Sequence, residues 1–196
     1  MHTEAIAVLD FWFGPADDPG HGQPRRAWFT KDAAFDASIA QRFGALIEDA
    51  LAGRLDDWVG KPIEPLPALA LVIVLDQFTR NVFRGTARAF AGDPRALQIA
   101  RAMVSSGADR QLGSVQRQFV YLPFEHAEDL SHQRSSVQLF EQLAQDDPAR
   151  ADLVEWARRH LDIVERFGRF PHRNAALGRE STPAEAAFLL TPGSGF

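Results

Sequence analysis

Three short stretches of the sequence combine charged, hydrogen-bonding and aromatic side chains, the residue types from which binding and catalytic sites are built. They run from Asp76 to Asn81, from Pro123 to Asp129 and from Arg169 to Asn174. Helical projection places several of their polar side chains on faces that are otherwise apolar. Because burying a polar group costs free energy unless it finds a partner, we expect a polar cluster inside the fold.

The first stretch changes character along a single helical face. Leu69 and Ile73 share this face with Asp76, Arg80 and Arg84. Asp76 and Arg80 are four residues apart, so they can pair directly on one helix.

The second stretch lies on an apolar stripe that has leucines at positions 122 and 130. Helical spacing puts His126, Asp129 and Gln133 within the stripe, whereas Glu128 and His132 project away from it and are expected to be solvated. A carboxylate at position 129 then needs a cationic partner from another part of the chain.

The first functional hypothesis is an internal pocket that binds a small anionic molecule or the acidic end of a peptide. Arginine forks bind carboxylates and phosphates in two-point geometry, and the second and third stretches add histidines. The predicted lining comprises Asp76, Arg80, Arg84, His126, Asp129, Arg169, His172, Arg173 and Asn174.

Two other hypotheses remain open. One is a hydrolase-like acid–base enzyme in which His126 is the base and Asp129 or Asp76 orients it. The other is a structural scaffold in which a buried ionic network fixes the register of packed helices.

Metal and cofactor chemistry are not expected. His126, Asp129, His160 and His172 could supply ligands, but their spacing matches neither a zinc motif nor an EF-hand, and nearby arginines repel cations. His160 alone, on an apolar helical face, is typical of a core histidine. The chain has no cysteine, GxSxG elbow, P-loop or dinucleotide fingerprint.

The three stretches are far apart in sequence, and we expect the fold to bring them together. The prediction is that Asp76, Arg80, His126, Asp129, His172 and Arg173 meet around one site. Arg80, Arg84 and Arg173 are the arginines expected to neutralise Asp129.

The elements that position these residues are predicted to be helices throughout. The pairs Asp93-Pro94 and Thr182-Pro183 are typical helix starts, and Gly107 and Gly168 are typical stops. A long helix is expected from Ser114 to about residue 145, kinked at Pro123. We predict one all-α domain over residues 1–196, with seven or eight helices packed partly as antiparallel hairpins, and a flexible tail at 190–196.

Composition narrows the class of protein. The chain has 196 residues, 45% hydrophobic and 24% charged, with a net charge of −5, which argues against a nucleic-acid binder. No run approaches the roughly 18–20 apolar residues of a membrane span, and the amino terminus does not resemble a signal peptide. We expect a soluble cytoplasmic protein with no membrane partner. Nothing in the sequence indicates an oligomeric state.

Taken together, the polar stretches and their flanks resemble the domain-of-unknown-function 924 family, a bacterial and fungal group described as having a tetratricopeptide-like helical fold. The resemblance implies that fold but no activity, cofactor or partner. Thr79 stands where proline is usual in the family and Ala127 where serine is usual. Neither a proline ring at position 79 nor a serine hydroxyl at position 127 is therefore essential here. The matching segments are residues 8–14, 28–29, 75–81, 83–86, 121–126, 128–129, 166–174 and 178–179.

Overall fold

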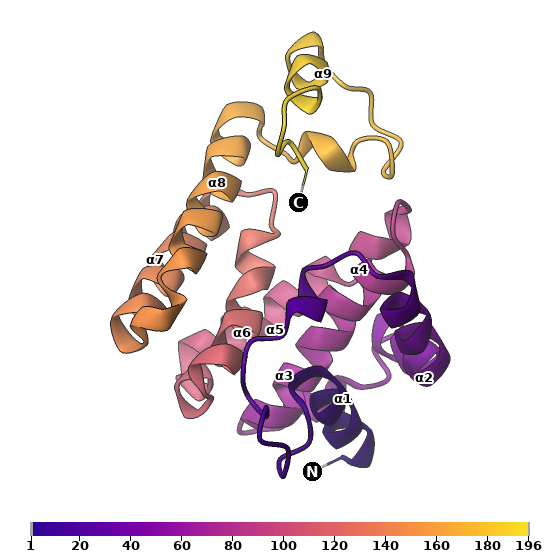
Figure 1. Cartoon of the computed structure of the whole chain (residues 1–196), viewed down its shortest axis with the longest axis vertical. Helices are drawn as coiled ribbons and strands as arrows, with labels where there is room; N and C mark the ends of the chain where they lie inside the picture. Colours follow the sequence, from indigo (N-terminus) through magenta and orange to yellow (C-terminus); the bar gives the residue numbers. More distant parts are fainter. Residues whose placement is uncertain (1, 196) are drawn as a thin grey trace. The chain divides into compact units, whose positions relative to one another are not determined.

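The computed structural model describes residues 2–195, which form helices joined by turns and loops, with no strand in that part of the chain (Figure 1). The α-helices are α1 (Thr3–Phe13), α2 (Ala33–Leu51), α3 (Pro65–Ile73), α4 (Thr79–Val82), α5 (Asp93–Ser106), α6 (Ser114–Glu125), α7 (Leu130–Asp146), α8 (Asp152–Phe167) and α9 (Pro183–Leu189). A π-helical segment, η3 (Val74–Phe78), joins α3 to α4, so these three form one continuous helix. The described residues thus hold eight helices, and the predicted all-α class is confirmed.

Short 3₁₀ turns occupy many of the connections. They are η1 (Arg26–Trp28), η2 (Asp56–Val59), η4 (Ala87–Phe90), η5 (Ala108–Gln111), η6 (Pro148–Arg150) and η7 (Pro171–Arg173). Within residues 2–195, no helix combines the length and the apolar character that crossing a bilayer requires.

The helices group into two compact units. Unit 1 comprises residues 2–84 and 88–123, and unit 2 comprises residues 85–87 and 124–195. The single domain expected over residues 1–196 stays a prediction, as does its tetratricopeptide-like arrangement. The tail expected at 190–196 ends at Phe196, which lies outside the described residues.

Unit 1 is built around the helix formed by α3, η3 and α4. Every residue from 67 to 79 is buried, and those from 67 to 75 form an unbroken apolar run. Helices α1 and α5 pack against α3, while α2 packs against η3 and α4. Trp12 packs edge to face with both Phe78 and Phe119 at centroid distances of 5.6 Å, a geometry that aromatic cores favour.

The middle of this central helix departs from α geometry. In η3 the hydrogen bonds skip one more residue than in an α-helix. The Leu75 carbonyl accepts a 2.8 Å hydrogen bond from the Thr79 hydroxyl. Gly92 also lies against this carbonyl, and a Cβ at Gly92 would be 2.2 Å from its oxygen. Only glycine allows so close an approach to the helix that carries Asp76.

Unit 2 contains the pair α7 and α8, which run side by side (Figure 1). Helix α8 ends at Phe167, and the residue that follows, Gly168, has a φ of 71°, as the predicted stop requires. Helix α9 starts with the predicted capping box, in which the side chains and backbone of Thr182 and Glu185 bond reciprocally. The turn η7 packs against α9 and carries the third polar stretch.

The long helix expected from Ser114 to about residue 145 is wrong. Helix α6 ends at Glu125, two residues after Pro123, and α7 begins at Leu130. Asp129 precedes α7 with extended backbone angles (φ −146°, ψ 126°), and its carboxylate accepts the backbone N–H groups of Ser131 and His132. Because Asp129 caps a new helix, residues 126–129 do not continue the helical phase of α6.

Candidate functional site

Unit 2 gathers two histidines and one arginine around the ring of Phe170, and a third histidine lies beside one of them. The His160 ring lies 5.6 Å from the Phe170 centroid and the His172 ring lies 5.7 Å from it. The Arg173 guanidinium lies over the same ring at 4.6 Å, which is a cation–π contact. The His126 ring is 6.4 Å from that of His160. These four polar side chains are called the His/Arg cluster below.

The cluster is layered from buried to accessible. His160 and Arg173 are 5% and 6% exposed, whereas His126 and His172 are half-buried. The α8 stripe therefore buries His160, as predicted, and the rigid turn at Pro171 fixes Arg173 beneath the surface. Solvent reaches the cluster through its two outer histidines.

Glu125 supplies a carboxylate at the edge of the cluster. It ends α6, is 4% exposed, and its Oε1 lies 3.3 Å from Nδ1 of His160. The same Nδ1 donates a 2.8 Å hydrogen bond to the Trp156 carbonyl one turn earlier in α8. Because a carbonyl only accepts, Nδ1 carries the proton, and the lone pair of the neutral ring is on Nε2.

His160 is neutral at pH 7. Burial is the largest cause that lowers the pKa of His160, and with the charges of the neighbouring His126, Arg173 and His172 it brings this pKa to about 3. The hydrogen bond to Trp156 acts in the opposite direction but is outweighed. The shift shows that His126, Arg173 and His172 are close enough for their charges to act together.

A second layer of contacts holds the Phe170 turn in place. Glu128 accepts the Phe170 backbone N–H at 2.7 Å and both terminal nitrogens of Arg179 at 2.6 and 2.9 Å. Arg179 also donates to the Phe170 carbonyl and to Asn174. Burial alone would raise the pKa of Glu128, but the hydrogen bonds from Arg179 and Phe170 leave it below its ordinary value.

Glu128 was expected to be solvated, and that expectation is wrong. The projection assumed an unbroken helix through residue 128, but the residue lies in the turn between α6 and α7. His132, expected to be solvated as well, is half-buried with its ring 6.2 Å from that of Phe124. The only sequence signal that pointed to a role for Glu128 was its position close to Glu125 and His126 in the chain.

Gln133 is fully buried, as predicted, and it fastens this turn. Its amide nitrogen donates to the carbonyls of Glu125 at 2.6 Å and Ala127 at 2.7 Å. A side chain of α7 thereby satisfies the last carbonyl of α6 and one carbonyl of the turn that follows it. The backbone that carries His126 is fixed by these two bonds.

Asp129 does not lie on a buried stripe, and this correction changes its role. The residue is exposed, and its carboxylate accepts hydrogen bonds from the backbone of Ser131 and His132 and from the Ser131 hydroxyl. These bonds lower the pKa of Asp129, the one from the Ser131 side chain most strongly. The carboxylate needs no arginine because it caps α7.

Two of the three arginines expected to neutralise Asp129, Arg80 and Arg84, have partners in unit 1, and the third, Arg173, lies over the Phe170 ring in unit 2. Arg80 pairs with Asp76 at 3.0 Å, as predicted, and forks onto both carboxylate oxygens of Asp93 at 2.7 and 2.9 Å. Burial alone would lower the pKa of Arg80, but Asp76 and Asp93 raise it above its ordinary value. This triad joins the central helix to the start of α5.

A second ion pair of unit 1 lies beyond the end of α4. Arg84 binds Asp36, in the first turn of α2, at 2.6 and 3.0 Å, and Asn81 donates to the same carboxylate at 2.7 Å. Burial opposes the ionisation of Asp36, but these donors keep its pKa below the ordinary value. Both networks of unit 1 pair each cation with a carboxylate of another helix, as a structural role requires.

The predicted site residues thus fall into two groups. Asp76, Arg80 and Arg84 belong to unit 1, while His126, His172, Arg173 and the buried Asn174 belong to unit 2. The convergence of all three stretches on one site stays a prediction. Arg169 is also in unit 2, where it binds Glu185 rather than the cluster. No group of three His, Asp or Glu side chains within residues 2–195 has an arrangement that could hold a metal ion.

Comparison with known proteins identifies the family of this chain but no activity for it. Residues 8–193 match the family described as bacterial protein of unknown function (DUF924). The chain belongs to this family. No protein with a curated description matches the chain.

A solved structure is also similar over nearly the full length. It is that of the protein of unknown function ATU0120 from Agrobacterium tumefaciens, with 40% sequence identity and a TM-score of 0.80. The match covers 95% of this chain and 97% of that chain.

Proposed function

We propose that the protein binds a small anion, a carboxylate or a phosphate, at the His/Arg cluster of unit 2. The observation that carries the proposal is the convergence of His126, His172 and Arg173 on the buried His160, whose pKa they help to lower to about 3. Positive groups gathered in one place favour a bound anion.

The packing of the His/Arg cluster supports a binding role. The Arg173 guanidinium lies over the Phe170 ring, and the rings of His160 and His172 lie close to it. His126 and His172 are half-buried, so a ligand can reach them without unfolding the turn.

The same chemistry suits the carboxylate at the end of a peptide. The two sources can be separated with a short peptide in carboxylate and amide forms. A peptide site requires that the free carboxylate bind and the amide fail. A small-anion site requires inorganic phosphate or acetate to bind by itself.

The test is isothermal titration calorimetry of the full-length protein with inorganic phosphate, acetate and the two peptides at pH 6.0 and 8.0. We expect saturable binding that is stronger at pH 6.0, since protonated histidines add positive charge. Arg173→Met and His172→Gln should each weaken binding at least about tenfold, the loss of one charge-assisted contact. Arg101→Met and His132→Gln are the matched controls, since Arg101 is exposed in α5 and His132 lies outside the cluster.

Two results would contradict the proposal. One is the absence of saturable binding of any probe to a folded protein. The other is an equal loss of affinity in Arg101→Met and Arg173→Met, which would show that binding depends only on the net charge of the protein.

Acid–base catalysis is the second candidate, and Glu125 favours it in a changed form. The predicted pair was His126 and Asp129, but the buried Glu125 lies next to His126 and contacts His160 at 3.3 Å. His126 would then act as the base and Glu125 as the carboxylate beside it. If the protein hydrolyses p-nitrophenyl acetate, Glu125→Gln should abolish the rate and Asp129→Asn should leave it; the reverse order would restore the original pair.

A further inference from the structure

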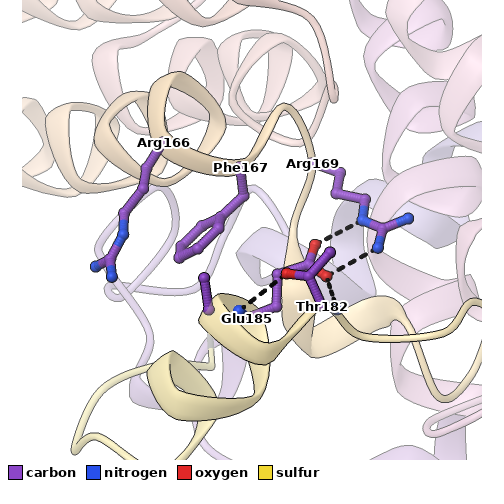
Figure 2. A pocket seen from close by; sticks show the side chains of 6 residues that line it. Arg166, Phe167, Arg169, Thr182 and Glu185 are labelled. Carbon is purple, nitrogen blue, oxygen red and sulfur yellow. Dashed lines mark hydrogen bonds and ion pairs between the residues drawn. The ribbon is translucent and has the colours of Figure 1, made fainter.

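A hollow of about 690 Å³ lies in unit 2 where α8 ends and α9 begins (Figure 2). Its lining residues are Arg166, Phe167, Arg169, Thr182, Ala184 and Glu185. This volume is within the range of small-molecule sites, roughly 300–1,000 Å³. The hollow shares no lining residue with the His/Arg cluster.

Arg166 presents a positive charge at one wall of the hollow. Its guanidinium lies 4.6 Å from the ring centroid of Phe167 and 5.6 Å from that of Phe188. It makes no ion pair with a carboxylate in the described part of the chain, and Figure 2 shows its side chain beside Phe167 with no dashed line to it. The exposed Arg158 and Arg159 of the same helix each bind a glutamate.

The facing wall is electrically neutral. Arg169 binds both oxygens of Glu185 at 2.6 and 2.8 Å, and the Thr182 backbone N–H donates to the same carboxylate at 2.7 Å. The hydrogen bond from Arg169 holds the pKa of Glu185 at about 2. Because this carboxylate is saturated with donors, the charge left over in the lining is that of Arg166.

An apolar surface completes the hollow. Phe167 packs against Phe188 at 5.1 Å, and both rings rest on the core of Ile163, Val164 and Phe170. Ala184 adds a small side chain on the α9 side, which leaves room. The Thr182 hydroxyl accepts the Glu185 backbone N–H at 3.2 Å, which holds the start of α9 at the edge of the hollow.

We propose that this hollow binds a small aromatic carboxylate. The ligand carboxylate would pair with the Arg166 guanidinium, which its contact with two rings holds in place. The ligand ring would pack against Phe167 in the edge-to-face or offset geometry that aromatic pairs prefer. A bare ion would fill little of this volume, whereas a benzoate-sized molecule uses both the charge and the apolar wall. The site is independent of the anion site proposed above.

The test is amide chemical-shift titration of the ¹⁵N-labelled full-length protein with sodium benzoate, and with acetate and benzamide as comparison probes. We expect saturable shifts confined to residues 166–169 and 182–185. Benzoate should bind at least about tenfold more tightly than either comparison probe, because acetate lacks the aromatic ring and benzamide lacks the carboxylate. Equal affinity for benzoate and acetate, or no saturable shift, would overturn the proposal.

Paired variants separate binding from folding. Arg166→Gln removes the charge, and Ala184→Leu fills the hollow; each should weaken benzoate binding at least about tenfold while the remaining spectrum is unchanged. Arg101→Gln and Ala187→Leu are the controls, because both residues are exposed and neither lines the hollow. Unchanged binding in Ala184→Leu would also overturn the proposal, since the ligand would then lie elsewhere.

Discussion

The backbone N–H of Phe170 donates a 2.7 Å hydrogen bond to the carboxylate of Glu128, which lies 42 residues earlier in the chain. Arg179 then closes the contact by bonding both the Glu128 carboxylate and the Phe170 carbonyl. The turn that carries His172 and Arg173 is therefore positioned by a residue of the α6–α7 connection. The geometry of the His/Arg cluster depends on this pair.

Glu128→Gln should destabilise the protein by about 1–2 kcal/mol, since Arg179 would lose its carboxylate in a half-buried setting. Chemical denaturation in urea measures the change. Glu141→Gln is the control, because Glu141 pairs with Arg158 on the surface and its loss should cost less than about 0.5 kcal/mol. Equal effects of the two substitutions would show that Glu128 has no positioning role.

The stability of the protein should fall as the pH drops from about 6.5 towards 3. The pKa of His160 is about 3 in the folded chain and near 6.5 in the unfolded chain, so within this window the unfolded state binds one more proton. That single group contributes a slope of at most about 1.4 kcal/mol per pH unit. His160→Asn should flatten the profile of unfolding free energy against pH in this window, and a profile parallel to that of the parent would contradict the assignment.

Arg80→Met should cost about 3–5 kcal/mol, because it removes the arginine that pairs with the fully buried Asp76. Arg84→Met is the matched variant: its ion pair with Asp36 is partly exposed, so we expect a loss of about 1 kcal/mol or less. Thermal unfolding followed by circular dichroism compares the two. A smaller loss for Arg80→Met than for Arg84→Met would argue against the triad as the structural tie of unit 1.

Gly92→Ala should prevent stable folding or cost several kcal/mol, since its Cβ would lie 2.2 Å from the Leu75 carbonyl oxygen, a backbone atom that cannot move alone. Gly44→Ala should instead stabilise the protein by up to about 1 kcal/mol. Gly44 lies inside α2 and a Cβ there meets no atom within 4 Å. Urea midpoints of the two variants should move in opposite directions; movement in the same direction would refute the close contact.

The spacing of residues in the sequence predicted the contacts and the burial that are determined within a single helix. The Asp76–Arg80 pair, the burial of Gln133 and His160, and the Thr182–Glu185 capping box follow from residues within one or two turns of each other. The partners that come from other helices were not predictable in this way. Asp93 was recognised as a helix start but not as the second carboxylate of Arg80.

The error at Asp129 has a specific physical cause. Periodicity assigns a face to each residue only while the helix continues, and Pro123 suggested a kink where the chain in fact starts a new helix. Asp129 is itself a good capping residue, so the sequence held a signal for the break. If Asp129 is interpreted as an N-cap, the helical projection no longer assigns Glu128 to a face. Glu125 is then the carboxylate nearest the histidines.

The π-helical segment η3 also determines which side chains of unit 1 can meet. A π-turn accommodates one residue more than an α-turn, so every residue after it is rotated by about 100° relative to a regular helix. Asn81 and Arg84 both follow this rotation, and both reach Asp36. Deleting one residue between 74 and 78 would preserve the apolar character of the helix but turn these two donors away from α2. The length of this segment, more than its hydrophobicity, therefore fixes the contact between the central helix and α2.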